Sequence, residues 1–246
     1  MITSINNEKI KEISKLKEKK YRDKSNLFLV ETYHLVEEAY KNNLLEEVYL
    51  LDGKNINIDT KINIVNEGVM KKLTSTDTVP EIIGVVRKKE DNEVIGKKVL
   101  ILDRIQDPGN LGTIIRSAVA FNVDTVILSD DTVDLYNSKV LRSTQGMLFQ
   151  INIVRNNLEE IIKELKEDSF QIIGTDVNDG ESLKNFSINK DSKFALVVGN
   201  EGNGLSHDVR ELCDRFIYID MKNSVDSLNV GVACSIILYE MSDNSE

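Results

Sequence analysis

The amino-acid sequence predicts an α/β protein of two domains, a small α/β domain over residues 1–90 and a parallel-sheet domain over residues 98–246. Short apolar runs rich in Val and Ile alternate with segments of helical periodicity along the chain. A charged, glycine-containing run at residues 87–98 interrupts this alternation and indicates a linker. In the second half, loops rich in glycine and polar residues follow the apolar runs, which is where a parallel sheet binds its ligands.

The first domain alternates short strands with amphipathic helices, a pattern typical of a small α/β sandwich. We expect helices at residues 6–20, 33–41 and 69–73. The expected strands span residues 28–30, 47–51, 62–65 and 82–86. In the first helix, Ile10, Ile13 and Leu16 recur at helical spacing and should face the core.

In the second domain, helices separate the successive strands, so we expect a parallel sheet that is covered on both faces. The expected strands span residues 99–102, 126–128, 151–154, 171–175, 194–198 and 216–219. The expected helices span residues 111–121, 138–145, 158–166, 206–213 and 227–241. The regions of Asp103, Thr175, Gly199 and Ile219 should then meet at the carboxyl edge of the sheet.

Composition excludes several classes of protein. No apolar run reaches eighteen residues, and the first residues lack the apolar core of a signal peptide, so we expect neither a membrane span nor secretion. Cys213 and Cys234 lack metal-ligand spacing, and the only histidines are His34 and His207, so we predict no metal site. Reduced thiols favour a cytoplasmic location.

The distribution of charge leaves two interpretations open. The formal net charge is −10, which argues weakly against a nucleic-acid partner. The first 26 residues, however, hold eight Lys and Arg against four Asp and Glu. This basic stripe, which includes Lys15, Lys19, Lys20 and Arg22, is either a surface for RNA phosphates or the solvated face of a helix.

Two loops of the second domain carry candidate functional residues. In the first, Asp107-Pro108-Gly109 forms a turn, Asn110 can cap the following helix, and Arg116 lies further along it. A turn, a cap and a surface arginine would also explain this pattern without any function.

The second loop is glycine-rich and contains Glu201 as its only charge. Its glycines allow a ligand to approach the backbone, and we expect a side chain at Gly199 to clash with that ligand. The spacing G-x-x-G-x-G reverses the dinucleotide fingerprint, which disfavours a nicotinamide-dependent oxidoreductase.

The last helix, residues 227–241, is apolar on most of its faces and must be buried in a core or against another subunit. Polar residues precede it, and some of them must cap its first turn.

Three stretches, DRIQDPGNLGTIIRSAVAF, FALVVGNEGNGLS and IYIDMKNSVDSLNVGVA, resemble the three motifs of the SpoU (TrmH-type) RNA ribose 2′-O-methyltransferases of the SPOUT superfamily. Their order and spacing fit over about residues 98–241. The stretch YRDKSNLFLVETYHLVEEA is similar to the small ribosomal-protein-like substrate-binding domain that often precedes the catalytic domain. The chain departs from the family pattern at Thr32, Asp220, Asn223 and Asp226, where relatives often have glycine, proline, glycine and glutamate.

The resemblance implies a C-terminal SPOUT domain with a deep trefoil knot, which binds S-adenosylmethionine and forms a homodimer through the knot region. It also implies transfer of a methyl group to a ribose of structured RNA, most often ribosomal RNA, with no metal. Two alternatives stay open, a transfer-RNA ribose methyltransferase and a non-catalytic RNA-binding protein that uses the basic stripe.

The resemblance assigns two sets of site residues. Those expected to bind the cofactor are Thr175, Gly199, Ile219, Met221 and Leu228. Those expected to act in catalysis are Arg116, Asn110, Glu201, Ser227 and Asn229. Because an arginine is almost always protonated, we expect Arg116 to orient the hydroxyl and stabilise the developing alkoxide rather than accept a proton. Asn110 and Asn229 would hold this arginine and the RNA backbone, and Glu201 would orient those groups.

Overall fold

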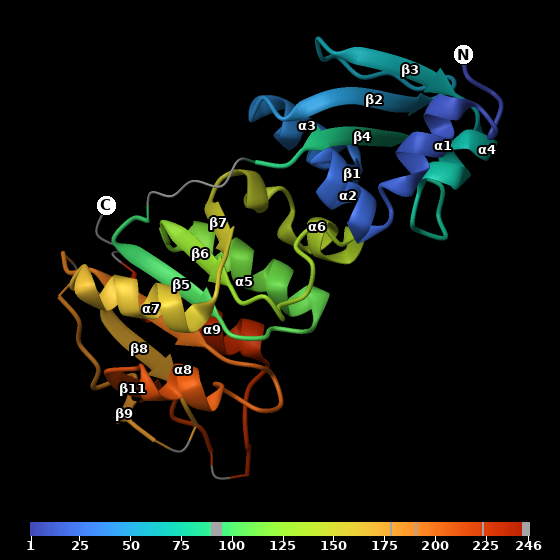
Figure 1. The fold of residues 1–246 in the computed structure, drawn as a ribbon. Helices are drawn as coiled ribbons and strands as arrows, with labels where there is room; N and C mark the ends of the chain where they lie inside the picture. The colour runs from blue at the N-terminus through green and yellow to red at the C-terminus, as the bar shows by residue number, and fades with distance from the viewer. Residues whose placement is uncertain (90–94, 178, 190, 223, 243–246) are drawn as a thin grey trace. The chain divides into compact units, whose positions relative to one another are not determined.

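The computed structural model describes residues 1–89, 95–177, 179–189, 191–222 and 224–242. The chain divides into two compact units (Figure 1). The first unit comprises Met1–Glu90 and Asp134–Phe149, and the second comprises Asp91–Val133 and Gln150–Glu246. Residues 134–149 fall inside the range that the sequence assigns to the second domain, so the structure interrupts that range. Of the expected linker, residues 87–98, the part from 90 to 94 lies outside the described residues.

The first unit contains a four-stranded sheet in the order β1-β4-β2-β3, in which only β2 and β3 are parallel. Its strands are β1 (Leu27–Glu31), β2 (Leu45–Leu51), β3 (Lys61–Val65) and β4 (Ile82–Arg87). Its helical elements are α1 (Glu8–Lys15), α2 (Lys19–Ser25), α3 (Tyr33–Lys41), α4 (Glu67–Leu73), α6 (Ser138–Thr144) and the 3-10 turn η1 (Met147–Phe149). Ile10 of α1 and Met70 of α4 share a core with Tyr49 of β2, which fixes α1 and α4 on one face of the sheet.

The helix expected at residues 6–20 is two helices, and the prediction of a single one is wrong. α1 ends at Lys15 and α2 begins at Lys19. The physical cause is Arg22, whose side chain is buried. Its guanidinium Nη1 donates to the carbonyl oxygens of Leu16 (2.9 Å) and Lys17 (2.7 Å). These carbonyls at the end of α1 are satisfied by a side chain, so the chain turns there.

The later segment of the first unit packs on β1 through aromatic rings. The Tyr136 ring centroid lies 4.6 Å from that of Phe28, and the Phe149 centroid lies 6.4 Å from it. Asp134, at the start of this segment, forms an ion pair with Arg22. Local sequence patterns cannot reveal these long-range contacts, so they do not predict that the segment belongs to this unit.

The second unit contains a seven-stranded parallel sheet in the order β7-β6-β5-β10-β8-β11-β9. Its strands are β5 (Lys98–Leu102), β6 (Thr125–Leu128), β7 (Asn152–Arg155), β8 (Gln171–Thr175), β9 (Glu181–Ser182), β10 (Phe194–Val198) and β11 (Arg215–Tyr218). Its helices are α5 (Pro108–Ala120), α7 (Leu158–Glu167), α8 (His207–Glu211) and α9 (Val230–Met241). The parallel sheet predicted from the sequence is confirmed, whereas the sequence pattern does not predict the two-residue strand β9.

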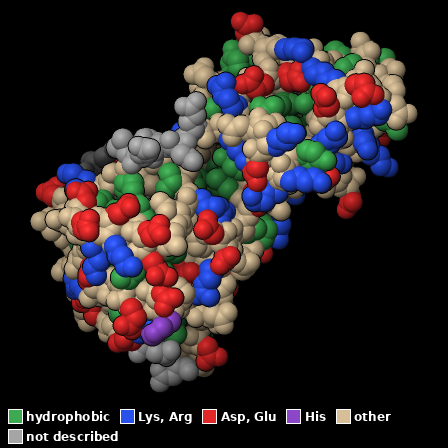
Figure 2. All heavy atoms as spheres, in the orientation of Figure 1, with side chains coloured by type: hydrophobic (Ala, Val, Ile, Leu, Met, Phe, Trp, Pro, Cys, Tyr) green, Lys and Arg blue, Asp and Glu red, His purple; other side chains and the backbone are tan. Residues whose placement is uncertain are grey.

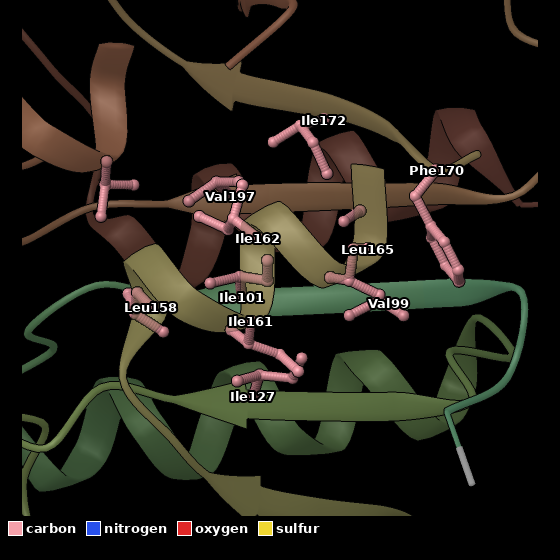
Figure 3. Close-up of a cluster of buried hydrophobic side chains, with 12 residues drawn as sticks. Val99, Ile101, Ile127, Leu158, Ile161, Ile162, Leu165, Phe170, Ile172 and Val197 are labelled. Atoms are coloured by element: carbon pink, nitrogen blue, oxygen red, sulfur yellow. The ribbon is translucent and has the colours of Figure 1, made fainter. Parts of the chain in front are cut away.

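Helices cover both faces of this sheet. α5 and α9 pack together on one face, and α7 and α8 cover the other (Figure 1). Apolar residues of α7 at helical spacing, including Ile162 and Leu165, meet Val99, Ile101 and Val197 of the central strands (Figure 3). Among the described residues, every helix is too short or too polar to span a bilayer.

The path after β11 brings the C-terminal helix back across the sheet. β11 lies beyond β8 in the strand order, yet α9 packs on α5, which follows β5. The described residues of this connection, 219–222 and 224–229, therefore run past the carboxyl ends of β8 and β10, where Ile219 and Leu228 meet Thr175 and Gly199. This crossing builds one side of a cavity.

Candidate functional site

A cavity of about 400 Å³ opens at the carboxyl ends of β8, β10 and β11, beside the start of α9. All five residues predicted to bind a cofactor line it, namely Thr175, Gly199, Ile219, Met221 and Leu228. Glu201 and Ser227, predicted to act in catalysis, also line it. The carboxyl edge of the sheet thus brings together residues that are spread over more than fifty positions of the chain.

The glycine loop folds back on itself beside the cavity. Asn200 and Gly204 exchange two backbone hydrogen bonds of 3.0 Å, and the Asn200 side chain accepts from the backbone N–H of Gly202 (3.0 Å). A β-carbon on Gly199 would lie 2.3 Å from the carbonyl carbon of Gly204. The expectation that a side chain here would clash with the ligand therefore needs correction, because it would first collide with the loop itself.

Glu201 joins the glycine loop to the start of α5. Its Oε1 accepts hydrogen bonds from Nδ2 of Asn110 (3.0 Å) and from the backbone N–H of Asp107 (3.1 Å). Its Oε2 accepts from the backbone N–H of Gln106 (3.3 Å). Burial raises the pKa of Glu201, but these hydrogen bonds outweigh it, so the net pKa lies below its ordinary value. The side chain is therefore a carboxylate at neutral pH.

Asn110 does not cap α5, contrary to expectation. The helix begins at Pro108, and Asp107 caps it by accepting from the backbone N–H of Asn110 (2.9 Å). The Asn110 side chain is therefore available for other contacts, and its Oδ1 accepts from Nδ2 of Asn229 (2.9 Å). Asn229 in turn caps α9, so the structure brings Asn110, Glu201 and Asn229 into one network.

Arg116 lies apart from this network. It is exposed on α5 and does not line the cavity. It forms no hydrogen bond or ion pair with any residue that the structure describes. Asn110 and Asn229 bind each other rather than Arg116, so the expectation that they hold this arginine is wrong for the described chain. Asn223 lies outside the described residues.

Sequence reasoning missed two charged residues of the cavity, Asp176 and Arg210. They form an ion pair with each other, and Asp179 pairs with Arg210 as well. Asp176 directly follows Thr175 at the end of β8, and this position could have identified it. No sequence signal pointed to Arg210, because its partners come from a distant loop.

The outer face of α9 is apolar and open to solvent. Val232, Ile236 and Tyr239 are 47%, 37% and 53% exposed and recur at helical spacing. The opposite face, with Cys234 and Ile237, is buried. The described part of the chain thus covers only one side of this helix.

The first unit carries the basic part of the molecule. It holds 18 Lys and Arg against 16 Asp and Glu, whereas the second unit holds 13 against 25. Figure 2 shows these basic side chains gathered over the visible face of the first unit. Lys15 and Lys20 lie 5.6 Å and 4.8 Å from the Tyr21 ring centroid. Arg22 of the basic stripe is only 6% exposed, so the idea that it contacts phosphates is wrong.

Comparisons with known proteins agree with the geometry. Residues 97–239 match the model of the SpoU rRNA Methylase family, and residues 7–84 match that of the MRM3-like substrate binding domain. The chain is 39% identical to the 23S rRNA (guanosine(2553)-2′-O)-methyltransferase RlmP of Bacillus subtilis (strain 168), over 98% of both chains.

Two solved structures are similar over almost the whole chain. The first is the AdoMet-bound rRNA methyltransferase from Sinorhizobium meliloti, with a TM-score of 0.84 at 29% identity, over 98% of this chain and 96% of that one. The second is the SpoU methyltransferase AviRb from Streptomyces viridochromogenes in complex with AdoMet. Its TM-score is 0.85 at 26% identity, over 96% of this chain and 97% of that one.

Proposed function

Since the chain belongs to the SpoU rRNA methylase family, we propose that the cavity at β8, β10 and β11 binds its methyl donor and that its substrate is 23S ribosomal RNA. Membership makes the protein an S-adenosylmethionine-dependent RNA ribose 2′-O-methyltransferase. This excludes a non-catalytic role. The relative named for guanosine 2553 of 23S rRNA supports a guanosine of 23S rRNA as the target.

The observation that carries the proposed cofactor site is the lining of the cavity. Its volume lies in the range of small-molecule sites, which is about 300–1,000 Å³. Ile217, Ile219 and Leu228 offer apolar contacts for a purine. The carboxylate of Glu201 suits a ligand with a positive sulfonium. The residues present therefore fit S-adenosylmethionine.

When bound, this cofactor supplies a methyl group on a sulfonium, which a ribose 2′-oxygen displaces. The protein must hold that oxygen in line and stabilise the charge that develops on it. We assign this second task to Arg116, whose guanidinium is cationic and has no partner among the described residues. Ionised Glu201 holds Asn110, and Asn110 and Asn229 then present amide groups beside the cavity. Ser227 offers a hydroxyl on the same rim.

We propose that the first unit binds RNA phosphates through the exposed part of the basic stripe. Lys15, Lys20 and Lys24 are exposed, and neither Lys15 nor Lys24 forms an ion pair with a described residue. The first two flank Tyr21, which adds an aromatic ring that a base can stack on. This view keeps the stripe but removes Arg22 from it, and Lys19 is left out because it pairs with Asp23.

The finer features of the fold are also proposals. The strand order and the packing of α9 on α5, which follows β5, support a C-terminal trefoil knot. The apolar outer face of α9 supports a homodimer through this region, because a two-fold contact would cover it. A ribosomal substrate and two free cysteines support a cytoplasmic location.

Two experiments test the proposed function. Calorimetry with S-adenosylmethionine should show one site per chain, and NAD should not bind. Mapping of ribose methylation in a deletion strain should show one guanosine of 23S rRNA that has lost its 2′-O-methyl group. Loss from a transfer RNA alone would favour the alternative substrate.

A further inference from the structure

We propose that Arg210 is a positioning residue of the cofactor cavity. Its side chain, on α8, bonds to Asp176 and Asp179 after β8 and so holds one wall of the cavity in place; we call these contacts the clasp. The inference rests on the proposed function, because the cavity matters only if it binds the cofactor. It concerns residues that the motifs do not contain.

The clasp consists of two ion pairs and one stacking contact. The guanidinium of Arg210 bonds to Asp176 through Nη1 and to Asp179 through Nη2, the latter at 3.0 Å. Its central carbon lies 4.4 Å from the centroid of the Phe216 ring on β11. Asp176 and Asp179 both follow β8, so one side chain of α8 ties that loop to two neighbouring elements.

The loop can come this close because two glycines make room for Phe216. A β-carbon on Gly174 would lie 2.6 Å from Cε1 of the Phe216 ring. A β-carbon on Gly180 would lie 2.2 Å from the Phe216 carbonyl oxygen, and Gly180 has a φ of +104°, which favours glycine. The backbone therefore lies directly against Phe216 on both sides of the ion-paired segment.

The clasped segment is a wall of the cavity. Thr175, Asp176 and Val177 all line it, and Arg210 lines it too. Without the guanidinium, Asp176 and Asp179 would lose the cation that both contact, and the repulsion between their carboxylates would weaken this wall of the cavity. Cofactor affinity should fall as a result. The catalytic network on Asn110, Glu201 and Asn229 belongs to other elements and should remain intact.

The chain offers a matched control for this test. Arg215 forms an ion pair with Glu181 and lies 4.7 Å from the Phe186 ring centroid, so it makes the same types of contact nearby. It does not line the cavity. Arg215→Ala therefore removes an equivalent pair without touching the proposed wall.

The experiment measures the affinity for S-adenosylmethionine by calorimetry, and KM and kcat for methyl transfer, in the full chain. Arg210→Ala should weaken binding about tenfold, since it removes hydrogen bonds between charged groups. Arg210→Lys should restore part of the affinity, and kcat at saturating cofactor should stay within about threefold of wild type because the catalytic groups are untouched. Arg215→Ala should bind like wild type.

Equal affinities of Arg210→Ala and wild type would overturn the inference, and so would an equal loss in Arg215→Ala. A kcat that collapses at saturating cofactor would assign Arg210 to catalysis instead. If Arg210→Ala does not fold, Asp179→Asn removes one of the two ion pairs of Arg210 at an exposed residue. This variant should also bind S-adenosylmethionine more weakly than wild type. An unchanged affinity of Asp179→Asn would likewise overturn the inference. A wild-type chain that binds no S-adenosylmethionine would refute the proposed function itself, which is a distinct result.

Discussion

Asn229 donates a hydrogen bond from Nδ2 to Oδ1 of Asn110 over 2.9 Å, although the two residues lie 119 positions apart. The orientation of both amides is determined by their other contacts. Asn229 uses Oδ1 to cap α9, so its Nδ2 must point to Asn110. Asn110 then accepts on Oδ1 and donates through Nδ2 to Glu201. The three motifs of the second unit are thus joined through one asparagine.

This network predicts that Asn110→Asp impairs methyl transfer. The new carboxylate would still accept a hydrogen bond from Asn229. It would, however, replace the Nδ2 donor of Asn110 with a negatively charged oxygen that repels the ionised Glu201. We expect the initial rate at saturating cofactor to fall about tenfold, equivalent to about 1.4 kcal/mol in the barrier. Asn157→Asp is the control, because Asn157 only caps α7 and aspartate caps equally well. Equal rates in the two variants would show that the network has no role in the reaction.

The basic stripe predicts a change in the salt dependence of RNA binding. Replacement of Lys15, Lys20 and Lys24 by Gln removes up to three ionic interactions with phosphates. The slope of log K against log salt should therefore shrink by about 0.7–0.9 for each phosphate that is no longer neutralised. The control is Lys163→Gln on α7 of the second unit, which is also exposed. Cofactor affinity should not change. A slope equal to that of wild type would mean that the stripe is only a solvated helix face.

Buried Glu47 predicts acid sensitivity of the first unit. Burial raises its pKa, but hydrogen bonds from Lys9, Tyr49 and Asn63 outweigh this, and the net pKa lies below the ordinary 4.5. Because the pKa of Glu47 is lower in the folded state than in the unfolded state, ionised Glu47 stabilises the fold. This stabilisation is complete above pH 4.5 and is lost as the pH falls through the pKa that Glu47 has in the folded protein.

Glu47→Gln should therefore lower the free energy of unfolding by about 2 kcal/mol at pH 7. The difference from wild type should shrink below pH 4.5, and urea denaturation across a pH series measures it. Glu46→Gln is the control, because Glu46 is exposed and its pair with Arg87 lies at the surface. A difference that does not vary with pH would contradict the assignment to Glu47.

The apolar face of α9 predicts a dimer that one charge can break. Ile236→Asp places a carboxylate in the proposed contact and should convert the dimer into a monomer of 27.8 kDa in light scattering. Ile62→Asp in the first unit is a close control, since both isoleucines are 37% exposed. A wild-type monomer at micromolar concentration would refute the dimer.

Much of the fold could be predicted because local patterns determine it. The parallel sheet followed from apolar runs separated by helices. The rule that ligands bind at the carboxyl ends of parallel strands placed Thr175, Gly199 and Ile219 around one cavity, but Asp103, which was expected with them, does not line it. The same rule could not identify Arg210, because its importance depends on Asp176 and Asp179 in another loop.

Some features of the structure depend on contacts that the periodicity of the sequence does not describe. The split between α1 and α2 requires Arg22, a later residue that binds the carbonyls of Leu16 and Lys17. The place of residues 134–149 depends on Phe28 rather than on their own periodicity. Thr32 has a φ of +134°, a region that favours glycine, so its departure from the family pattern leaves a strained turn that local propensity alone would not place there.

We propose that this chain methylates a ribose of ribosomal RNA with the cofactor held in the cavity at β8, β10 and β11. The most direct measurement is transfer of a labelled methyl group from S-adenosylmethionine to 23S rRNA, with the modified atom identified by mass spectrometry. We predict label on the 2′-oxygen of one guanosine for wild type, and no transfer for Arg116→Ala, although that variant binds the cofactor as wild type does. Label on a base, label on transfer RNA alone, or full activity of Arg116→Ala would contradict this proposal.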